Sequence, residues 1–153
     1  MLALSAMEAS ELGPWLDRLG AEYLEERVAA GDDRERAHRV IARDRADFFP
    51  ADAPAAGQLV FWVLEDERAV GSLWIGAVPG SPPEHWWVWS IEIDEPFRGR
   101  GLGRAAMELA EQEARRGGAR LLGLNVFGHN TVARSLYESL GYETTSLQMI
   151  KQL

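Results

Sequence analysis

Apolar side chains recur at spacings of three and four over the first third of the chain, which predicts two amphipathic helices. The first helix covers residues 10–29, and the second runs from Asp32 or Asp33 to about Phe48. Their apolar positions are Leu12, Trp15, Leu16, Leu19, Tyr23 and Leu24, then Ala37, Val40, Ile41 and Phe48. A short edge strand is expected before them, at residues 2–6.

Three β-rich runs in the middle of the chain predict strands. A loop rich in proline and alanine precedes them, and a second loop separates the last run from the first two. The first two runs flank the acidic turn at residues 65–67 and therefore form a hairpin. The predicted strands are residues 58–64, 69–77 and 86–93.

The last third of the chain alternates between helical and β patterns. Residues 101–116 carry one apolar face and end at two glycines, as an amphipathic helix does. A strand is expected at residues 121–127, a helix from Asn130 to Gly141, and a last strand at residues 142–152. This order predicts an α/β or α+β fold around a mixed sheet, formed by one domain over residues 1–153.

A glycine-rich turn separates the third predicted strand from the helix at residues 101–116. Its residues are Arg98, Gly99, Arg100, Gly101, Leu102 and Gly103, and Arg104 follows. Glycine allows a tight turn and a close approach of the backbone to a ligand. The following helix directs unpaired N–H groups and its positive dipole end at the turn. With three arginines nearby, these features predict a phosphate cradle and hence a phosphorylated cofactor.

Composition narrows the classes of partner. The net charge is −8 at pH 7, whereas nucleic-acid binders are usually basic, so no nucleic-acid partner is expected. No apolar run approaches the roughly 20 residues that span a bilayer, and no membrane partner is expected. The absence of cysteine excludes thiolate chemistry and favours a cytoplasmic location. No spacing of histidine and carboxylate residues suggests a metal site.

A second segment, residues 124–142, sharpens the interpretation of the glycine-rich turn. It reads Leu-Asn-Val-Phe-Gly-His-Asn-Thr-Val-Ala-Arg-Ser-Leu-Tyr-Glu-Ser-Leu-Gly-Tyr. This segment follows the pattern Arg98-x-x-Gly101-x-Gly103 in the chain. Two motifs in this order and at this spacing resemble those of the GCN5-related N-acetyltransferase (GNAT) superfamily, and the resemblance covers roughly residues 86–150. A Rossmann fingerprint would lie nearer the N-terminus with different spacing, and a Walker P-loop would need Gly-Lys-Ser/Thr.

The resemblance implies a fold, a cofactor and a reaction. The fold would be a mixed, mostly antiparallel sheet with helices on both faces and a splayed strand pair formed by residues 86–93 and 121–127. The cofactor would be an acyl-CoA, usually acetyl-CoA, whose acyl group passes directly to a primary amine in a ternary complex. Its pantetheine would pair with the backbone between Ile91 and Ile93, and its pyrophosphate would bind the N–H groups of residues 98–103.

Two residues are candidates for proton transfer. Tyr137 stands where the family places a tyrosine acid, and a phenol with a pKa near 10 stays protonated at neutral pH. The alternative is a half-buried tyrosine that only packs against the sheet. Glu92 is the candidate general base, acting through water, because a carboxylate in an apolar strand is costly without a partner or a function. The alternative is an ion pair with an arginine on a solvated sheet face.

Two asparagines have candidate roles near the cofactor. Asn130 is expected to hydrogen-bond the pantetheine arm, to cap its own helix, or to do both. Asn125, on the neighbouring strand, is expected to reach the substrate or the cofactor unless its role is structural.

Six tryptophans leave the acceptor site open to interpretation. Cross-strand packing in the core is the simplest role for those on the predicted strands. Alternatively, at least one of Trp62, Trp86 and Trp87 lines a pocket for the acceptor, which is a small-molecule amine or a peptide amine. A homodimer through the last strand or through an exposed aromatic surface is also compatible with the sequence. The rival function is an acyl-CoA-binding or sensing module that contacts a partner protein through the acidic N-terminal helices.

Overall fold

The computed structural model describes residues 1–153. Its main elements are β1 (Leu2–Ala6), α1 (Ala9–Ala29), α2 (Arg34–Phe48), β2 (Gln58–Glu65), β3 (Arg68–Ala77), β4 (His85–Ile93), α3 (Leu102–Arg116), β5 (Leu121–Leu124) and α4 (Thr131–Ser139). Two short 3₁₀ turns lie at Pro50–Asp52 and Glu95–Phe97. The predicted element order is therefore confirmed as far as α4. None of these helices has the length and apolar composition needed to span a bilayer.

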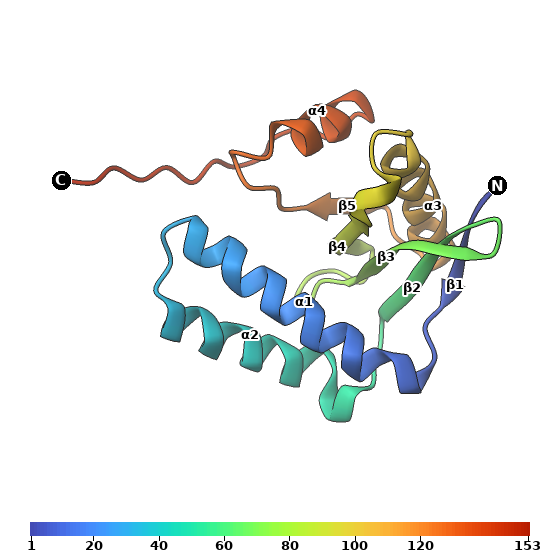
Figure 1. Cartoon of the computed structure of the whole chain (residues 1–153), viewed down its shortest axis with the longest axis horizontal. Helices are drawn as coiled ribbons and strands as arrows, with labels where there is room; N and C mark the ends of the chain where they lie inside the picture. Colours follow the sequence, from blue (N-terminus) through green and yellow to red (C-terminus); the bar gives the residue numbers. More distant parts are fainter.

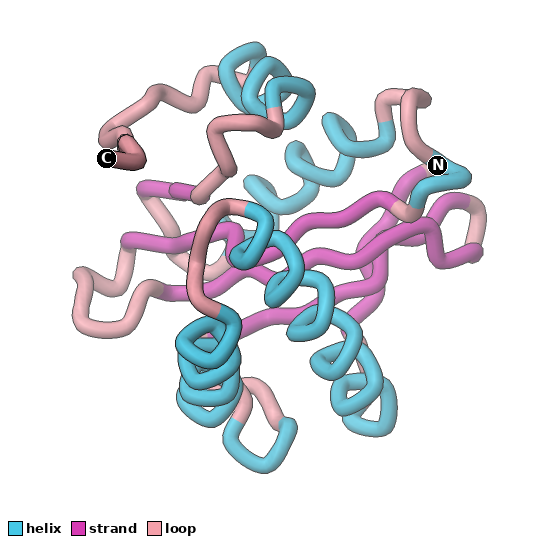
Figure 2. Tube along the Cα trace, turned by 60° about the vertical axis from the view of Figure 1, so that its left-hand side comes forward, coloured by secondary structure: helices cyan, strands magenta, loops and turns pink.

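The five strands form one sheet in the order β1-β2-β3-β4-β5. Neighbours among the first four strands are antiparallel, and β5 is parallel to β4. Helices α1 and α2 cover one face of the sheet and α3 covers the other (Figures 1 and 2). The fold is a mixed α/β fold with a mostly antiparallel sheet and helices on both faces, as predicted.

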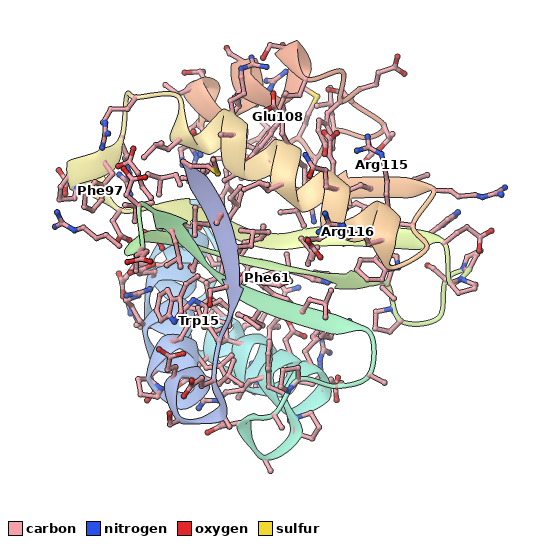
Figure 3. The ribbon with its side chains drawn as sticks, turned by 90° about the vertical axis from the view of Figure 1, so that its right-hand side faces the viewer. Trp15, Phe61, Phe97, Glu108, Arg115 and Arg116 are labelled. Carbon is pink, nitrogen blue, oxygen red and sulfur yellow. The ribbon has the colours of Figure 1, made fainter.

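Each face of the sheet has its own core because successive strand side chains point to opposite faces. On β3, Leu73 and Ile75 belong to the core under α3, whereas Trp74 packs with the core under α1. Figure 3 shows Trp15 on the side of α1, with α3 on the opposite side of the sheet. The core under α3 comprises Val63, Val70, Leu73, Ile75, Trp86, Val88, Ala106, Met107, Ala110 and Ala114, and the core under α1 comprises Leu12, Trp15, Leu16, Phe49 and Val60.

Strands β4 and β5 part midway along β4. Their pairing runs from His85 opposite Leu121 to Val88 opposite Leu124 and stops there. Residues 89–93 of β4 therefore have no neighbouring strand on that side, and the predicted splayed pair is confirmed. A bulge in the β3–β4 pairing coincides with the parting, since the register skips Trp89. Bulges bend and twist a strand, and this one turns β4 where it leaves β5.

The predicted last strand at residues 142–152 is wrong. Tyr142 still packs against the core under α3, but no regular element follows α4, and the chain runs away from the sheet (Figure 1). The side chains of Leu147, Met149 and Ile150 are exposed. Strand β5 ends at Leu124 rather than at residue 127. Apolar alternation predicts strand propensity, but a strand forms only where another strand pairs with it.

A substitution at Gly71 tests how closely β3 packs against β4. A Cβ at this position would lie 2.0 Å from the carbonyl oxygen of Glu92, whereas a Cβ at Gly128 would meet no atom within 4 Å. We expect Gly71→Ala to lower the free energy of unfolding by about 1–3 kcal/mol, the usual cost of overpacking. Gly128→Ala is the control and should change it by less than about 1 kcal/mol. Urea denaturation measures both, and equal effects would contradict the packing described.

Candidate functional site

The turn before α3 has the backbone of an anion cradle. Gly99 and Gly101 have φ angles of 74° and 79°, in the left-handed region that favours glycine. Helix α3 has no side-chain N-cap and no acidic residue in its first turn. In contrast, Asp33 caps α2 and Asn130 caps α4. The first N–H groups of α3 therefore have no side-chain acceptor, and they suit an anionic ligand.

The three arginines of the turn hold its position. Arg98 Nε donates to the carbonyl oxygen of Ile93 at 2.7 Å, which ties the turn to the end of β4. The guanidinium of Arg100 binds both carboxylate oxygens of Glu65 at the end of β2, at 3.0 and 2.8 Å. Arg104 donates to the hydroxyl of Ser139 at the end of α4. These side chains link three elements around the turn, and we assign them this anchoring role in addition to their charge.

The free edge of β4 leads directly into this turn. The side chains of Ile91 and Ile93 pack against the core under α3, which fixes the strand. On the side of β5, the backbone of residues 89–93 has no partner strand. Unpaired N–H and C=O groups on an edge pair readily with an extended ligand. Leu102, at the start of α3, also packs against this core, so the edge and the cradle share one support.

Helix α4 brings Tyr137 to the same end of the molecule. The Asn130 side chain accepts a hydrogen bond from the Ala133 N–H at 3.2 Å, so its capping role is confirmed. Gly103 of α3 faces Leu136 of α4, where an added Cβ would lie 3.5 Å from Leu136 Cδ2. Tyr137 is half-buried against the core under α3, and burial raises the pKa of its phenol. Tyr137 therefore holds its proton at neutral pH more firmly than a free tyrosine.

Tyr142 supports the ring of Tyr137 from one side. The two rings meet edge to face, with centroids 6.1 Å apart. The Tyr142 hydroxyl donates to Glu111 of α3 at 3.2 Å, which fixes the supporting ring. Asn125, in contrast, is exposed just beyond the end of β5 and makes no side-chain hydrogen bond.

Glu92 lies on the opposite face of β4 from Ile91 and Ile93. Its side chain is 30% exposed, and a carboxylate oxygen lies 3.7 Å from Arg98 Nη2. Burial raises the pKa of Glu92, and the nearby Glu22 of α1 raises it further, while Arg18 of the same helix opposes the shift. Glu92 therefore has an arginine neighbour, as the alternative expected, and its carboxylate is more basic than a free one.

The three candidate acceptor-site tryptophans separate in the structure. Trp62 of β2 lines a cavity against α1, on the same face as Glu92. Trp87 lies beside Trp89 and over Gly123 of β5, where an added Cβ would meet its ring. The expectation that Trp86 could line the acceptor pocket is wrong. Trp86 is 5% exposed and lies in the core under α3, on the face away from Glu92. We therefore exclude Trp86 from the acceptor site.

Sequence reasoning missed three features around Glu92. Arg18 and Glu22, one helical turn apart on α1, face β4 and act on the Glu92 pKa. The indole nitrogen of Trp89 is buried and has no hydrogen-bond partner. The spacing of Arg18 and Glu22 marks one side of a helix but does not say what that side faces. The bulge that turns Trp89 leaves no signal in the sequence that we can identify.

The chain is similar to known proteins in sequence and in fold. A model of the acetyltransferase (GNAT) family matches residues 16–142. The chain is 31% identical to the uncharacterized N-acetyltransferase YycN of Bacillus subtilis over 99% of both proteins. The crystal structure of YycN matches with a TM-score of 0.89 over 100% of this chain and 99% of that one. The uncharacterized N-acetyltransferase YdgE of the same organism is 38% identical over 61% of this chain and 60% of its own.

A more distant structure shares the fold alone. AAC(6')-Iy, in complex with the bisubstrate analog CoA-S-monomethyl-acetylneamine, matches with a TM-score of 0.63 at 18% identity. The match covers 100% of this chain and 98% of that one.

The raised pKa of Glu92 predicts a pH-dependent cost to stability. Its ordinary pKa is 4.5, and the folded state raises it, so the unfolded chain releases this proton more readily. The native protein should therefore lose stability, relative to Glu92→Gln, as the pH rises through and above about 4.5, and the two should converge at lower pH. Urea denaturation of both proteins between pH 4 and 8 measures this difference. A native protein that is more stable than Glu92→Gln at pH 8 would contradict it.

Proposed function

The chain belongs to the acetyltransferase (GNAT) family, and we propose that it transfers the acetyl group of acetyl-CoA directly to a primary amine, with both substrates bound together. The observation that carries this proposal is the free edge of β4 at residues 89–93, which leads into the uncapped N-terminus of α3. An extended ligand that ends in phosphate fits both features at once. The acceptor, a small-molecule or peptide amine, would approach from the face that carries Glu92.

The residues around this edge fit an acyl-CoA. Backbone groups of Ile91 and Ile93 would pair with the pantetheine amides. The N–H groups of residues 99–104 would bind the pyrophosphate, whereas the Arg98 N–H already donates to the Glu95 carbonyl oxygen. The side-chain amide N–H₂ of Asn130 remains a donor, because its capping bond uses only the oxygen. Asn125 would contact the same ligand from the end of β5. A Cβ at Gly99 or Gly101 would point into open space beside the turn, where the phosphates would lie.

Two side chains would move protons. Acetyl-CoA, when bound, supplies an activated acetyl thioester. Tyr137 carries a phenol proton that burial retains at neutral pH, and this proton is available to a departing thiolate. Glu92 would accept a proton from the acceptor ammonium group through a water molecule, and its raised pKa makes it a better base than a free carboxylate.

Removal of the Tyr137 hydroxyl tests its role as the acid. We expect Tyr137→Phe to lower kcat by about 10²–10⁴-fold, the usual contribution of general acid–base catalysis, with little change in the Kd for CoA. The control is Tyr23→Phe on α1, where the tyrosine is 40% exposed, and it should leave both constants unchanged. Thiol release measures turnover. Native turnover in Tyr137→Phe would remove this residue from the chemistry.

Backbone strain in the cradle tests the cofactor site. In Gly101→Ala, alanine must adopt a φ of 79° and its Cβ enters the cradle, so we expect CoA to bind about tenfold or more weakly. Gly80→Ala carries the same strain at a φ of 76° in a distant turn, with no atom within 4 Å of the new Cβ. Calorimetric titration with CoA should separate the two variants. Equal affinities would place the cofactor elsewhere.

A further inference from the structure

The chain contains a single lysine, and it lies in the tail that follows α4. Lys151 is the one lysine among 16 lysine and arginine residues, so all the others carry a guanidinium group. A guanidinium group stays protonated in proteins, whereas an amine becomes a nucleophile when it loses its proton. Lys151 therefore carries the only side-chain primary amine of the chain, and a primary amine is the acceptor in the proposed reaction.

The tail at residues 143–153 makes few contacts with the rest of the molecule. All of its residues are exposed, and it belongs to no helix or strand. Tyr142 is the last residue that forms a hydrogen bond, and Lys151 has no ionic partner. Chain ends that are neither buried nor hydrogen-bonded move readily. Lys151 can therefore sample the space around the point where the tail is attached.

That point of attachment lies beside the candidate acid. Tyr142 packs against the core under α3, and its ring meets the ring of Tyr137 with centroids 6.1 Å apart. Lys151 follows Tyr142 by nine positions. A tether of this length spans at most about 30 Å, and a flexible one has a root-mean-square length of about 15–20 Å. The amine of Lys151 is thus tethered within reach of Tyr137.

The tail also passes from one face of the sheet to the helices on the other. It begins at Tyr142, on the side of α3, and reaches the turn between α1 and α2. A Cβ added at Gly31 in that turn would lie 3.9 Å from Ile150 Cδ1. Figure 1 shows the tail passing this end of α1. Lys151, the next residue, therefore lies near the helices that cover the face of Glu92, from which the acceptor would approach.

The α-amine of Met1 provides an internal reference. It donates to a carboxylate oxygen of Asp66 at 2.7 Å, and it precedes β1, at the opposite edge of the sheet from β5. Met1 is 96% exposed, so free acetyl-CoA in solution has access to this amine. Acetylation of Met1 therefore reports the uncatalysed reaction with a primary amine that is remote from the site.

We propose that the protein acetylates its own Lys151 in an intramolecular reaction, an inference that rests on the proposed acetyl transfer. The ammonium group of Lys151 would lose a proton to solvent through Glu92 and water. Its Nζ would then attack the thioester carbonyl carbon, so that a C–N bond forms and the C–S bond breaks. Tyr137 would protonate the departing thiolate, and the second proton of the nitrogen would restore the phenol. The products are acetyllysine, the CoA thiol and one proton.

The tether accounts for the choice of this amine. A short flexible linker gives the attached group an effective concentration of about millimolar at its target. Such a concentration needs no binding pocket for the lysine side chain. The rate of an intramolecular reaction is also independent of the protein concentration, which gives the proposal a kinetic signature.

Mass spectrometry after incubation with isotopically labelled acetyl-CoA tests the proposal. We expect one labelled acetyl group per chain, on Lys151, at a rate about 10²-fold or more above that of the Met1 amine. Tyr137→Phe should remove most of this excess and leave the labelling of Met1 unchanged. Dilution of the protein should not alter the fraction of Lys151 labelled at a given time.

Two variants are matched controls for the position of the lysine. Lys151→Arg keeps the charge and should be labelled at Met1 only, with native CoA affinity and native turnover of added amines. Arg116→Lys/Lys151→Arg moves the lysine to the end of α3, where the side chain of residue 116 is 70% exposed. Figure 3 shows Arg116 across the sheet from Trp15. The lysine at this position should be labelled no faster than Met1, and labelling at the native rate of Lys151 would overturn the role of the tether.

A mixture of two variants distinguishes reaction within one molecule from reaction between molecules. Tyr137→Phe offers the lysine without the candidate acid, and Lys151→Arg offers the acid without the lysine. The mixture should label the lysine no faster than Tyr137→Phe does alone. Faster labelling, or a rate that rises with protein concentration, would overturn the intramolecular reaction.

Two further outcomes separate the proposal from its premise. Acetylation of added amines with no excess label on Lys151 would overturn self-acetylation and leave the proposed acetyl transfer in place. Absence of CoA binding by calorimetry, with no thiol release from any amine and no label on Lys151, would overturn both.

Discussion

The parting of β4 from β5 is the constraint on which the rest of the site depends. Pairing stops at Val88, and the next five residues of β4 keep a free edge on that side. Free strand edges attract extended chains, and proteins usually cover or shorten them. Here the edge persists because β3 holds β4 from the other side. The core under α3 supports one face of β4, and Trp89 packs against Phe48 and Trp74 on the other. The edge then runs through one 3₁₀ turn into the glycine-rich cradle.

One strand therefore serves three purposes at once. Its edge is available to an extended ligand, Ile91 and Ile93 anchor it in the core under α3, and Glu92 projects toward α1. The site has a cost in stability, seen in the raised pKa of Glu92 and in the buried, unpartnered indole nitrogen of Trp89. Such costs are common at functional sites, where the surrounding fold supplies the compensation. Glu92 and Trp89 both lie on or near the bulge that turns β4.

Local sequence patterns were sufficient to predict most elements and the glycine-rich turn before α3. Helical periodicity located α1 and α2, and strand alternation placed Glu92 opposite Ile91, because both signals arise within one element. Contacts between elements could not be predicted from these local patterns. The burial of Trp86 under α3, the approach of Arg18 to Glu92 and the missing last strand all depend on register and on partners far along the chain. A single sequence carries no direct record of such pairings.

Hydrogen exchange of the β4 backbone amides, with and without CoA, shows whether the free edge of β4 binds the cofactor. Exchange reports on local hydrogen bonding, so a ligand that pairs with the free edge must slow it there. We expect added protection at residues 89–93 and in the turn at 99–104, and little change at residues 85–88, which already pair with β5. Tight CoA binding with unchanged exchange at residues 89–93, or with protection confined to β1 and β2, would contradict it.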